Sequence, residues 1–476
     1  MSIRESIFWT TLQFFVLIGI ELASLAVLAR ILTPGQMGQY ALAFAITRLF
    51  QFVGNFGMFA VIVRADAMER DDRARVLAVT LTAGGAATAV LAAAAWLPTP
   101  LFGDETRALL RVMLLTVLPV GLGMIMTALL TRQLRFRTLL ALRICATVTF
   151  PAVAIPLALS GHGPLSLAYG YAASTLLYAA LGLVATSGAF LVRPATRGLR
   201  QMLGFAATLF SASALAEAAE AALPAMIGRL LGFDALGLFS RARELIVRAN
   251  LAMTDTVMPA LTPHLFTAGR EQRDLRQGFL TGLTNMTAIC LPAAGLLWLA
   301  SPMIVRLLLG PAWTAATPIL GLLAIGLCVT PLSALAGLFA LTLRKERILL
   351  YQGAVYLAGM LAVGASAAWF GVIQVAGALV ALQVAMAILY LTTASAVLKV
   401  GPLAMVRAIA PSVVVLAATL APALLVHHLV AAPAPLAGLA LDLVAGGFGW
   451  LAGVFLTHHP LRAEILALAT GKLGAR

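Results

Sequence analysis

The sequence is a series of apolar runs, each about twenty residues long or longer and separated by short polar segments. Fourteen such runs are visible, at roughly 7–29, 37–63, 76–97, 108–131, 138–159, 165–191, 203–231, 236–265, 278–300, 316–342, 348–369, 373–398, 403–429 and 434–457. About twenty residues is the length at which an α-helix crosses the hydrocarbon core of a bilayer, whereas a barrel strand needs about ten residues of alternating polarity. The pattern therefore predicts an all-α membrane protein with about 14 transmembrane helices.

The composition favours lipid over water as the solvent of these runs. Hydrophobic residues form 62% of the 476-residue chain, charged residues form 11%, and the mean hydropathy is +1.00. Soluble domains carry roughly half apolar and a quarter charged residues, so this excess has no aqueous core to enter. The connections between runs are short, and the longest polar remainder is the tail at 461–476. A separate soluble catalytic domain is therefore not expected.

The net charge of +14 is concentrated on one side of the predicted bundle. Connections after even-numbered runs are basic, as in "RADAMERDDRAR" (64–75) and "RQLRFR" (132–137), whereas those after odd-numbered runs, such as "SGHGP" (160–164), are nearly free of positive charge. Lys and Arg accumulate in the cytoplasmic loops of membrane proteins. We therefore expect both termini to be cytoplasmic, and we expect no nucleic-acid partner.

One segment of the sequence occurs twice. "LARILTPGQMGQY" (28–40) aligns with "IGRLLGFDALGLF" (227–239) at an offset of 199 residues, and Glu21 aligns with Glu220 at the same offset. Six runs separate the copies, and because six is even both copies point the same way across the membrane. This arrangement is typical of transporters with two parallel lobes. We expect lobes at 1–200 and 201–400, two additional helices at 401–460 and a cytoplasmic tail at 461–476.

Charged residues inside the apolar runs concentrate in the first, second, seventh and eighth runs. A charge at the bilayer centre costs roughly 3 kcal/mol or more, so such side chains face a cavity or one another. Arginines outnumber the acids near them, which suits a cavity that binds an anion, and guanidinium groups match phosphate oxygens. The predicted substrate-binding residues, on polar faces that could meet across a central cavity, are Arg48, Gln51, Asn55, Arg241, Arg243, Arg248 and Asn250. The acids expected to balance charge or carry a coupling proton are Glu21, Glu217, Glu220, Glu244 and Asp255.

A structural alternative stays open for any one of these residues. Arginine and glutamate inside a membrane can pair simply to hold helices, and Arg241 and Glu244 have the spacing of such a pair on one helix. The surplus of positive charge is the feature that pairing does not explain. Prolines inside the runs, including Pro224 and Pro331, predict kinks or unwound turns.

Other site types find no support in the sequence. The three cysteines (Cys145, Cys290 and Cys328) lie in apolar runs without disulfide or metal spacing, and the pairs His427–His428 and His458–His459 close different runs at opposite faces. No P-loop is present. We expect no metal, no cofactor and no enzymatic activity.

Four motifs in register resemble those of bacterial polysaccharide flippases of the Wzx/PST type, in the MOP exporter superfamily. They are "ARILTPGQMGQYALA" (29–43), "LLTRQLRFRTL" (129–139), "DTVMPALTPHL" (255–265) and "LLLGPAWTAATPILGLLAI" (307–325). In that family an acidic pair usually follows the Thr-Pro of the first motif. Here Gly35 and Gln36 stand there, while Asp234 keeps an acid in the second copy, so we expect an altered cap on the second run.

The resemblance implies a flippase of the bacterial inner membrane. It would move undecaprenyl-pyrophosphate-linked oligosaccharide to the periplasmic leaflet by alternating access of two V-shaped lobes. Its partners would be the lipid-linked substrate, membrane lipid, and a polysaccharide polymerase with its chain-length machinery. In the related lipid II flippases two extra helices flank the lipid tail, a role that 401–460 would then share.

Three other functions fit the sequence less well. A cation-coupled multidrug exporter would share the two lobes but needs an acidic or aromatic cavity to hold cationic drugs. A membrane polymerase or ligase needs a large periplasmic loop, which the short connections do not provide. An interaction scaffold would leave the charges inside the runs unexplained.

Overall fold

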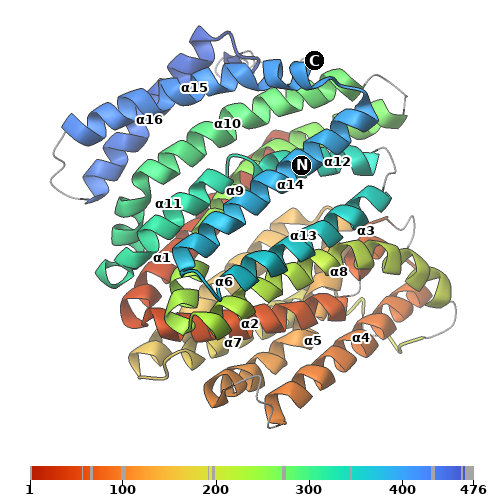
Figure 1. The fold of residues 1–476 in the computed structure, drawn as a ribbon. Coiled ribbons are helices and arrows are strands. Elements are labelled where there is room, and N and C mark those ends of the chain that lie inside the picture. The colour runs from red at the N-terminus through yellow and green to blue at the C-terminus, as the bar shows by residue number, and fades with distance from the viewer. Residues whose placement is uncertain are drawn as a thin grey trace. The chain divides into compact units, whose positions relative to one another are not determined.

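The computed structural model describes residues 3–55, 57–64, 68–97, 103–190, 192–195, 199–270, 275–342, 346–429, 435–462 and 465–466. Their regular structure is entirely helical, which confirms the predicted all-α class (Figure 1). The chain divides into two compact units, Met1–Gly237 and Leu238–Arg476, and the division falls near the start of one long helix. The lobe boundaries expected from the repeat, at 200 and 400, stay a prediction.

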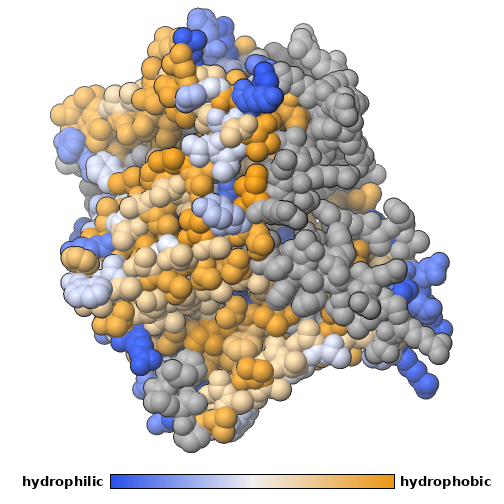
Figure 2. All heavy atoms as spheres, turned by 45° about the vertical axis from the view of Figure 1, so that its right-hand side comes forward, coloured by the Kyte–Doolittle hydropathy of each residue, from blue (hydrophilic) through white to orange (hydrophobic). Residues whose placement is uncertain are grey.

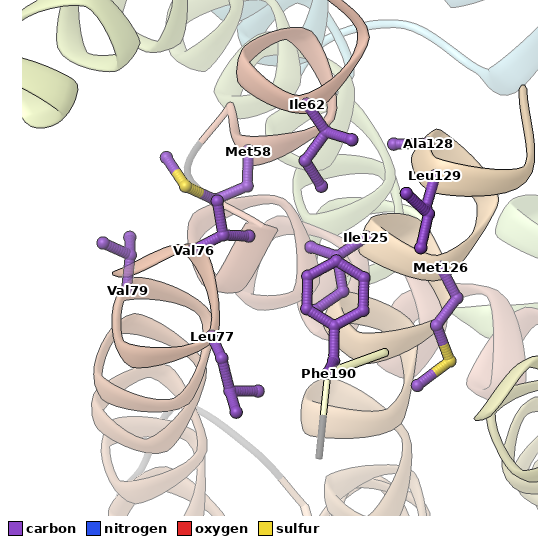
Figure 3. Close-up of a cluster of buried hydrophobic side chains, with 10 residues drawn as sticks. All are labelled: Met58, Ile62, Val76, Leu77, Val79, Ile125, Met126, Ala128, Leu129 and Phe190. Carbon is purple, nitrogen blue, oxygen red and sulfur yellow. The ribbon is translucent and has the colours of Figure 1, made fainter. Parts of the chain in front are cut away.

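The first unit is a helical bundle in which α2 packs on α4, α5 and α8, while α5 also packs on α7. Its helices are α1 (Ile3–Ile31), α2 (Pro34–Asn55), α3 (Met58–Arg64), α4 (Arg70–Trp96), α5 (Asp104–Arg132), α6 (Phe136–Leu159), α7 (Leu165–Ala185) and α8 (Leu199–Leu230). A buried cluster fills the space where α3, α4 and α5 meet, and Phe190 closes it from the segment after α7 (Figure 3).

The second unit begins within α9 (Phe233–Arg270), and in it α10 packs on α15, α16 and α11. Its further helices are α10 (Leu275–Ile304), α11 (Thr317–Gly326), α12 (Thr330–Thr342), α13 (Glu346–Ser366), α14 (Val372–Leu398), α15 (Pro402–Leu429) and α16 (Pro435–Leu456). A π turn (Val305–Leu309) and a 3-10 turn (Pro311–Ala316) join α10 to α11.

The chain is a multi-pass membrane protein. Among the described residues, nine helical segments are long and apolar enough to span a bilayer, and all nine fall on predicted runs. A tenth run contains a shorter apolar helix, Leu350–Ser366. The other four runs correspond to α1, to α2 with α3, to α8 and to α9, and these are the runs in which charged residues concentrate. The total of 14 therefore stays a prediction. Among the residues that Figure 2 colours, hydrophobic ones cover the larger part of the face shown, as a lipid-facing exterior requires.

Two predicted runs are each broken into two helices. Run 37–63 breaks between α2 and α3, where Gly57 has φ +70°, a backbone region that favours glycine. Run 316–342 breaks at Leu327–Val329, just before Pro331, whose ring cannot follow a continuous helix without displacing the carbonyl four residues earlier. Pro331 therefore marks an unwound turn as predicted, whereas α8 continues through Pro224.

The repeated corner has the same helix boundaries in both copies. A helix ends at Ile31 and the next begins at Pro34, and in the second copy the equivalents are Leu230 and Phe233, again 199 residues apart. Thr33 and Gln36 form a reciprocal cap on α2: the Gln36 N–H donates to Thr33 Oγ1 (3.3 Å) and the Thr33 N–H donates to Gln36 Oε1 (3.0 Å). The expected change of cap is thus a neutral capping box with proline at the first helical position.

Candidate anion-binding site

Three charged residues on one face of α9 form a compact cluster. The Glu244 carboxylate bridges two arginines: Oε2 accepts from Arg241 Nη1 at 2.6 Å, and Oε1 accepts from Arg248 Nη2 at 2.6 Å. At about 100° per residue, positions 241, 244 and 248 share a face, which is why the helix itself builds this cluster. Two guanidinium groups thus converge on one pair of anionic oxygens.

The cluster lies at the edge of the packed face of α9. Ala242, Leu245 and Ile246 are buried, whereas Val247 and Leu251 on the neighbouring face are 45% and 48% exposed. The three charged side chains are intermediate, with exposed fractions of 13% for Arg241, 23% for Arg248 and 29% for Glu244. The cluster is therefore partly exposed, while its partial burial strengthens the charge interactions inside it.

The segment 241–248 carries a surplus of positive charge. It contains three arginines, of which Arg243 is half-buried, and a single acid, Glu244. The two ion pairs described above join residues of one helix, so these two contacts do not hold two helices together, and on exposed helices such pairs contribute only roughly 0.2–0.5 kcal/mol each.

The arginine of the first unit has a different environment. Arg48 on α2 donates from Nη2 to Glu217 Oε1 on α8 at 3.1 Å, and its side chain is 52% exposed. This pair does join two helices, so the structural interpretation applies to it directly. Its exposed guanidinium still has donors to offer, because one carboxylate oxygen engages only part of the five-donor fork.

Gln51 is held by two neighbouring helices. Its Nε2 donates to Thr116 Oγ1 of α5 at 2.8 Å, and its Oε1 accepts from the Tyr171 hydroxyl of α7 at 3.2 Å. The residue is buried, so the structure places it inside the bundle rather than on an open face. Sequence analysis missed Thr116 and Tyr171, and the signal available for them was only that a polar atom inside an apolar run needs a partner.

The remaining predicted residues are spread over several helices. Asn55 ends α2, and its buried Oδ1 accepts no hydrogen bond from any residue that the structure describes. Asn250 accepts a hydrogen bond from Thr330 at the start of α12 (3.2 Å). Glu21 and Glu220 are half-buried on α1 and α8. The Asp255 side chain lies outside the described residues, and the predicted convergence of all these groups on one chamber stays a prediction.

Comparison with known proteins gives one family match and one curated relative. Residues 27–318 match the family model described as polysaccharide biosynthesis protein. The succinoglycan biosynthesis transport protein ExoT of Rhizobium meliloti (strain 1021) is 28% identical over 336 residues, which cover 68% of this chain and 66% of that protein. The chain therefore spans slightly less than two thirds of the length of this relative.

Solved structures of transporters share the fold. The lipid II flippase MurJ in an inward closed conformation has a TM-score of 0.72 at 12% identity and covers 96% of this chain and 100% of its own. An inward-facing multidrug resistance MATE family transporter of the MOP superfamily has a TM-score of 0.67 at 13% identity, over 80% of this chain and 94% of its own. At these identities the likeness is one of fold alone.

Proposed function

Because the chain belongs to the polysaccharide biosynthesis protein family, we propose that it is a flippase for undecaprenyl-pyrophosphate-linked oligosaccharide in the bacterial inner membrane. It carries the sugar head group from the cytoplasmic to the periplasmic leaflet by alternating access, for surface polysaccharide or exopolysaccharide synthesis. Both termini lie in the cytoplasm. The lobes are 1–200 and 201–400, and the helices of 401–460 flank the polyprenyl tail.

The single observation that carries this proposal is the α9 cluster, in which Arg241 and Arg248 each donate to one oxygen of the same carboxylate. A phosphate presents oxygens to guanidinium groups in the same way, with stronger charge. The site therefore suits the pyrophosphate of a lipid-linked sugar, the one part of that substrate whose charge does not vary with sugar identity.

Polar side chains on α2 and α9, the helices that carry Arg48 and Arg248, are candidates for hydrogen bonds with the sugar. Among the described residues, no donor reaches Asn55 Oδ1, and the hydrogen bond shown for the Asn250 side chain uses its Oδ1, which accepts from Thr330, and not its amide donors. Gln51 is less suited, because both ends of its amide are engaged. Glu21, Glu217, Glu220 and Asp255 are the candidate charge-balancing or proton-coupling groups.

The test is polymer production in a deletion strain of the source organism complemented with variants. Arg248→Ala and Arg48→Ala should each reduce surface polymer roughly tenfold or more at equal protein level, since charge-assisted hydrogen bonds contribute about 1.5–3 kcal/mol. Arg75→Ala is the matched control, because Arg75 also pairs with an acid on its own helix (Asp72, 2.8 Å) but lies in α4, outside the site.

Two outcomes would count against the proposal. A normal amount of polymer from both arginine variants would show that Arg48 and Arg248 are not needed to bind the pyrophosphate. Hypersensitivity of the deletion strain to cationic drugs, with unchanged polymer, would favour the multidrug exporter that shares this fold. Loss of polymer together with accumulation of lipid-linked oligosaccharide on the cytoplasmic leaflet is the expected result.

A further inference from the structure

The two arginines proposed to bind pyrophosphate already hold an anion, the carboxylate of Glu244. Each of its oxygens accepts from a different guanidinium at 2.6 Å, one from Arg241 and one from Arg248. Resting on the proposed function, we propose that Glu244 is a placeholder: it occupies the arginine pair when no substrate is bound, and the pyrophosphate of the substrate displaces it.

The position of Glu244 fits this role better than a role in folding. All three residues lie on α9, so the two ion pairs that Glu244 makes with Arg241 and Arg248 do not join α9 to a second helix. The residues are half-buried rather than fully exposed, so two adjacent guanidinium groups without an anion would repel each other strongly. A tethered carboxylate removes that repulsion in the empty state.

The chemistry of displacement follows from charge and geometry. A carboxylate supplies two oxygens and one negative charge, whereas a pyrophosphate ester supplies more oxygens and more charge to the same two arginines. The pyrophosphate therefore displaces the Glu244 carboxylate from Arg241 and Arg248. Because Glu244 stays attached beside the site, it returns to the arginines when the phosphate moves, which lowers the net affinity and lets the substrate leave on the other side of the membrane.

The pair Arg48–Glu217 has the same composition but lacks this geometry. There one arginine meets one carboxylate oxygen, the partner belongs to another helix, and the guanidinium is 52% exposed. The placeholder role is therefore assigned to Glu244 alone, and Glu217 serves as an internal comparison.

The experiment measures binding of inorganic pyrophosphate to the purified full-length protein in lipid nanodiscs by isothermal titration calorimetry. Glu244→Gln keeps the shape of the side chain and removes its charge. We expect it to bind pyrophosphate about tenfold more tightly than the unaltered protein, a change equivalent to about 1.4 kcal/mol. In cells the same variant should export less polymer, because release of the substrate slows.

Opposite changes in binding and export separate a placeholder from a structural residue, whose loss would weaken both. Asp72→Asn is the matched control, since Asp72 pairs with Arg75 on one helix at 2.8 Å and lies in α4, so it should change neither quantity. Should Glu244→Gln fail to yield folded protein, Glu244→Asp replaces it. The shorter side chain cannot bridge both arginines, so it should also bind pyrophosphate more tightly than the unaltered protein.

The failure of this proposal differs from the failure of the proposed function. Equal or weaker binding in both Glu244 variants, with binding still dependent on Arg241 and Arg248, overturns the placeholder and leaves the phosphate site. Pyrophosphate binding that is unchanged in Arg241→Ala and Arg248→Ala overturns both.

Discussion

Gly38 and Gly237 pack reciprocally across the repeated corner. A Cβ added to Gly38 would lie 1.9 Å from the Phe233 carbonyl oxygen, and a Cβ added to Gly237 would lie 1.8 Å from the Pro34 carbonyl oxygen. Phe233 and Pro34 are the first residues of α9 and α2, so each copy places its glycine on the opening carbonyl of the other. The contact is reciprocal, so a residue without a side chain is needed at the same position of both copies. This explains why the sequence contains this corner twice.

Substitution of either glycine should destabilise the protein. Gly38→Ala or Gly237→Ala would force a methyl group to within 2 Å of a backbone carbonyl, which cannot rotate away. Overpacking costs about 1–3 kcal/mol even where side chains can adjust, and more is expected here. We expect a lower unfolding temperature in detergent and less protein in the membrane.

Gly85→Ala in α4 is the control, because no atom lies within 4 Å of its added Cβ, and it should be neutral or slightly stabilising. Equal stability of Gly38→Ala and Gly85→Ala would contradict the close approach.

The fold could be predicted from the sequence largely because hydrophobicity decides it. Apolar runs of the right length specify helices in lipid, and the repeat specifies two corners with equal boundaries. The break at Gly57 was not predicted, because a glycine inside an apolar run does not change hydropathy. The break before Pro331 was predicted, because proline removes a backbone donor and its effect is local.

Only those contacts of the candidate site that lie within one helix could be predicted from the sequence. Arg241, Glu244 and Arg248 share a helix face, so their spacing in the sequence specifies their contact. Gln51 meets Tyr171 and Thr116, which are 120 and 65 residues away in the sequence, and no local pattern encodes such a contact. The prediction that Gln51 binds substrate follows from the polar face of its own helix alone, and that face carries no information about the helices packed against it.

Loss of Gln51 should therefore affect stability. Gln51→Leu removes the donor to the buried Thr116 hydroxyl and the acceptor of the half-buried Tyr171 hydroxyl, and an unsatisfied buried polar group costs about 1–3 kcal/mol. The double variant Gln51→Leu/Tyr171→Phe removes both polar groups and should recover part of the loss in thermal unfolding measurements. Full stability of Gln51→Leu, with a specific loss of polymer, would instead support direct contact with the sugar.

A hydrogen-bonded pair with one buried member joins α15 and α16. His427 Nδ1 on α15 lies 2.9 Å from Asp442 Oδ2 on α16, and Asp442 is 1% exposed. His427→Leu leaves the buried Asp442 side chain without this hydrogen-bond partner, which should cost about 1–3 kcal/mol of unfolding free energy. His427→Leu/Asp442→Leu should recover most of that stability, because neither polar side chain then remains without its partner. If the double variant is less stable than the single one in thermal unfolding, the pair has a role beyond satisfying each other's hydrogen bond.

His459 follows the last membrane-spanning helix and should make the protein sensitive to acid. Burial lowers the pKa of His459, an effect that the nearby Thr284 backbone partly opposes. Its Nδ1 accepts the Leu461 N–H at 3.2 Å, which requires this nitrogen to be unprotonated. In the unfolded chain a histidine gains its proton below about pH 6.5, whereas the folded state resists protonation until a lower pH. The unfolded state therefore binds more protons in that window, and stability should fall as the pH drops through it.

His459→Gln cannot gain charge, so its unfolding temperature relative to that of the unaltered protein should rise as the pH is lowered from 8 to 5.5. A constant difference across that range would show that His459 is as easily protonated in the folded protein as in the unfolded chain.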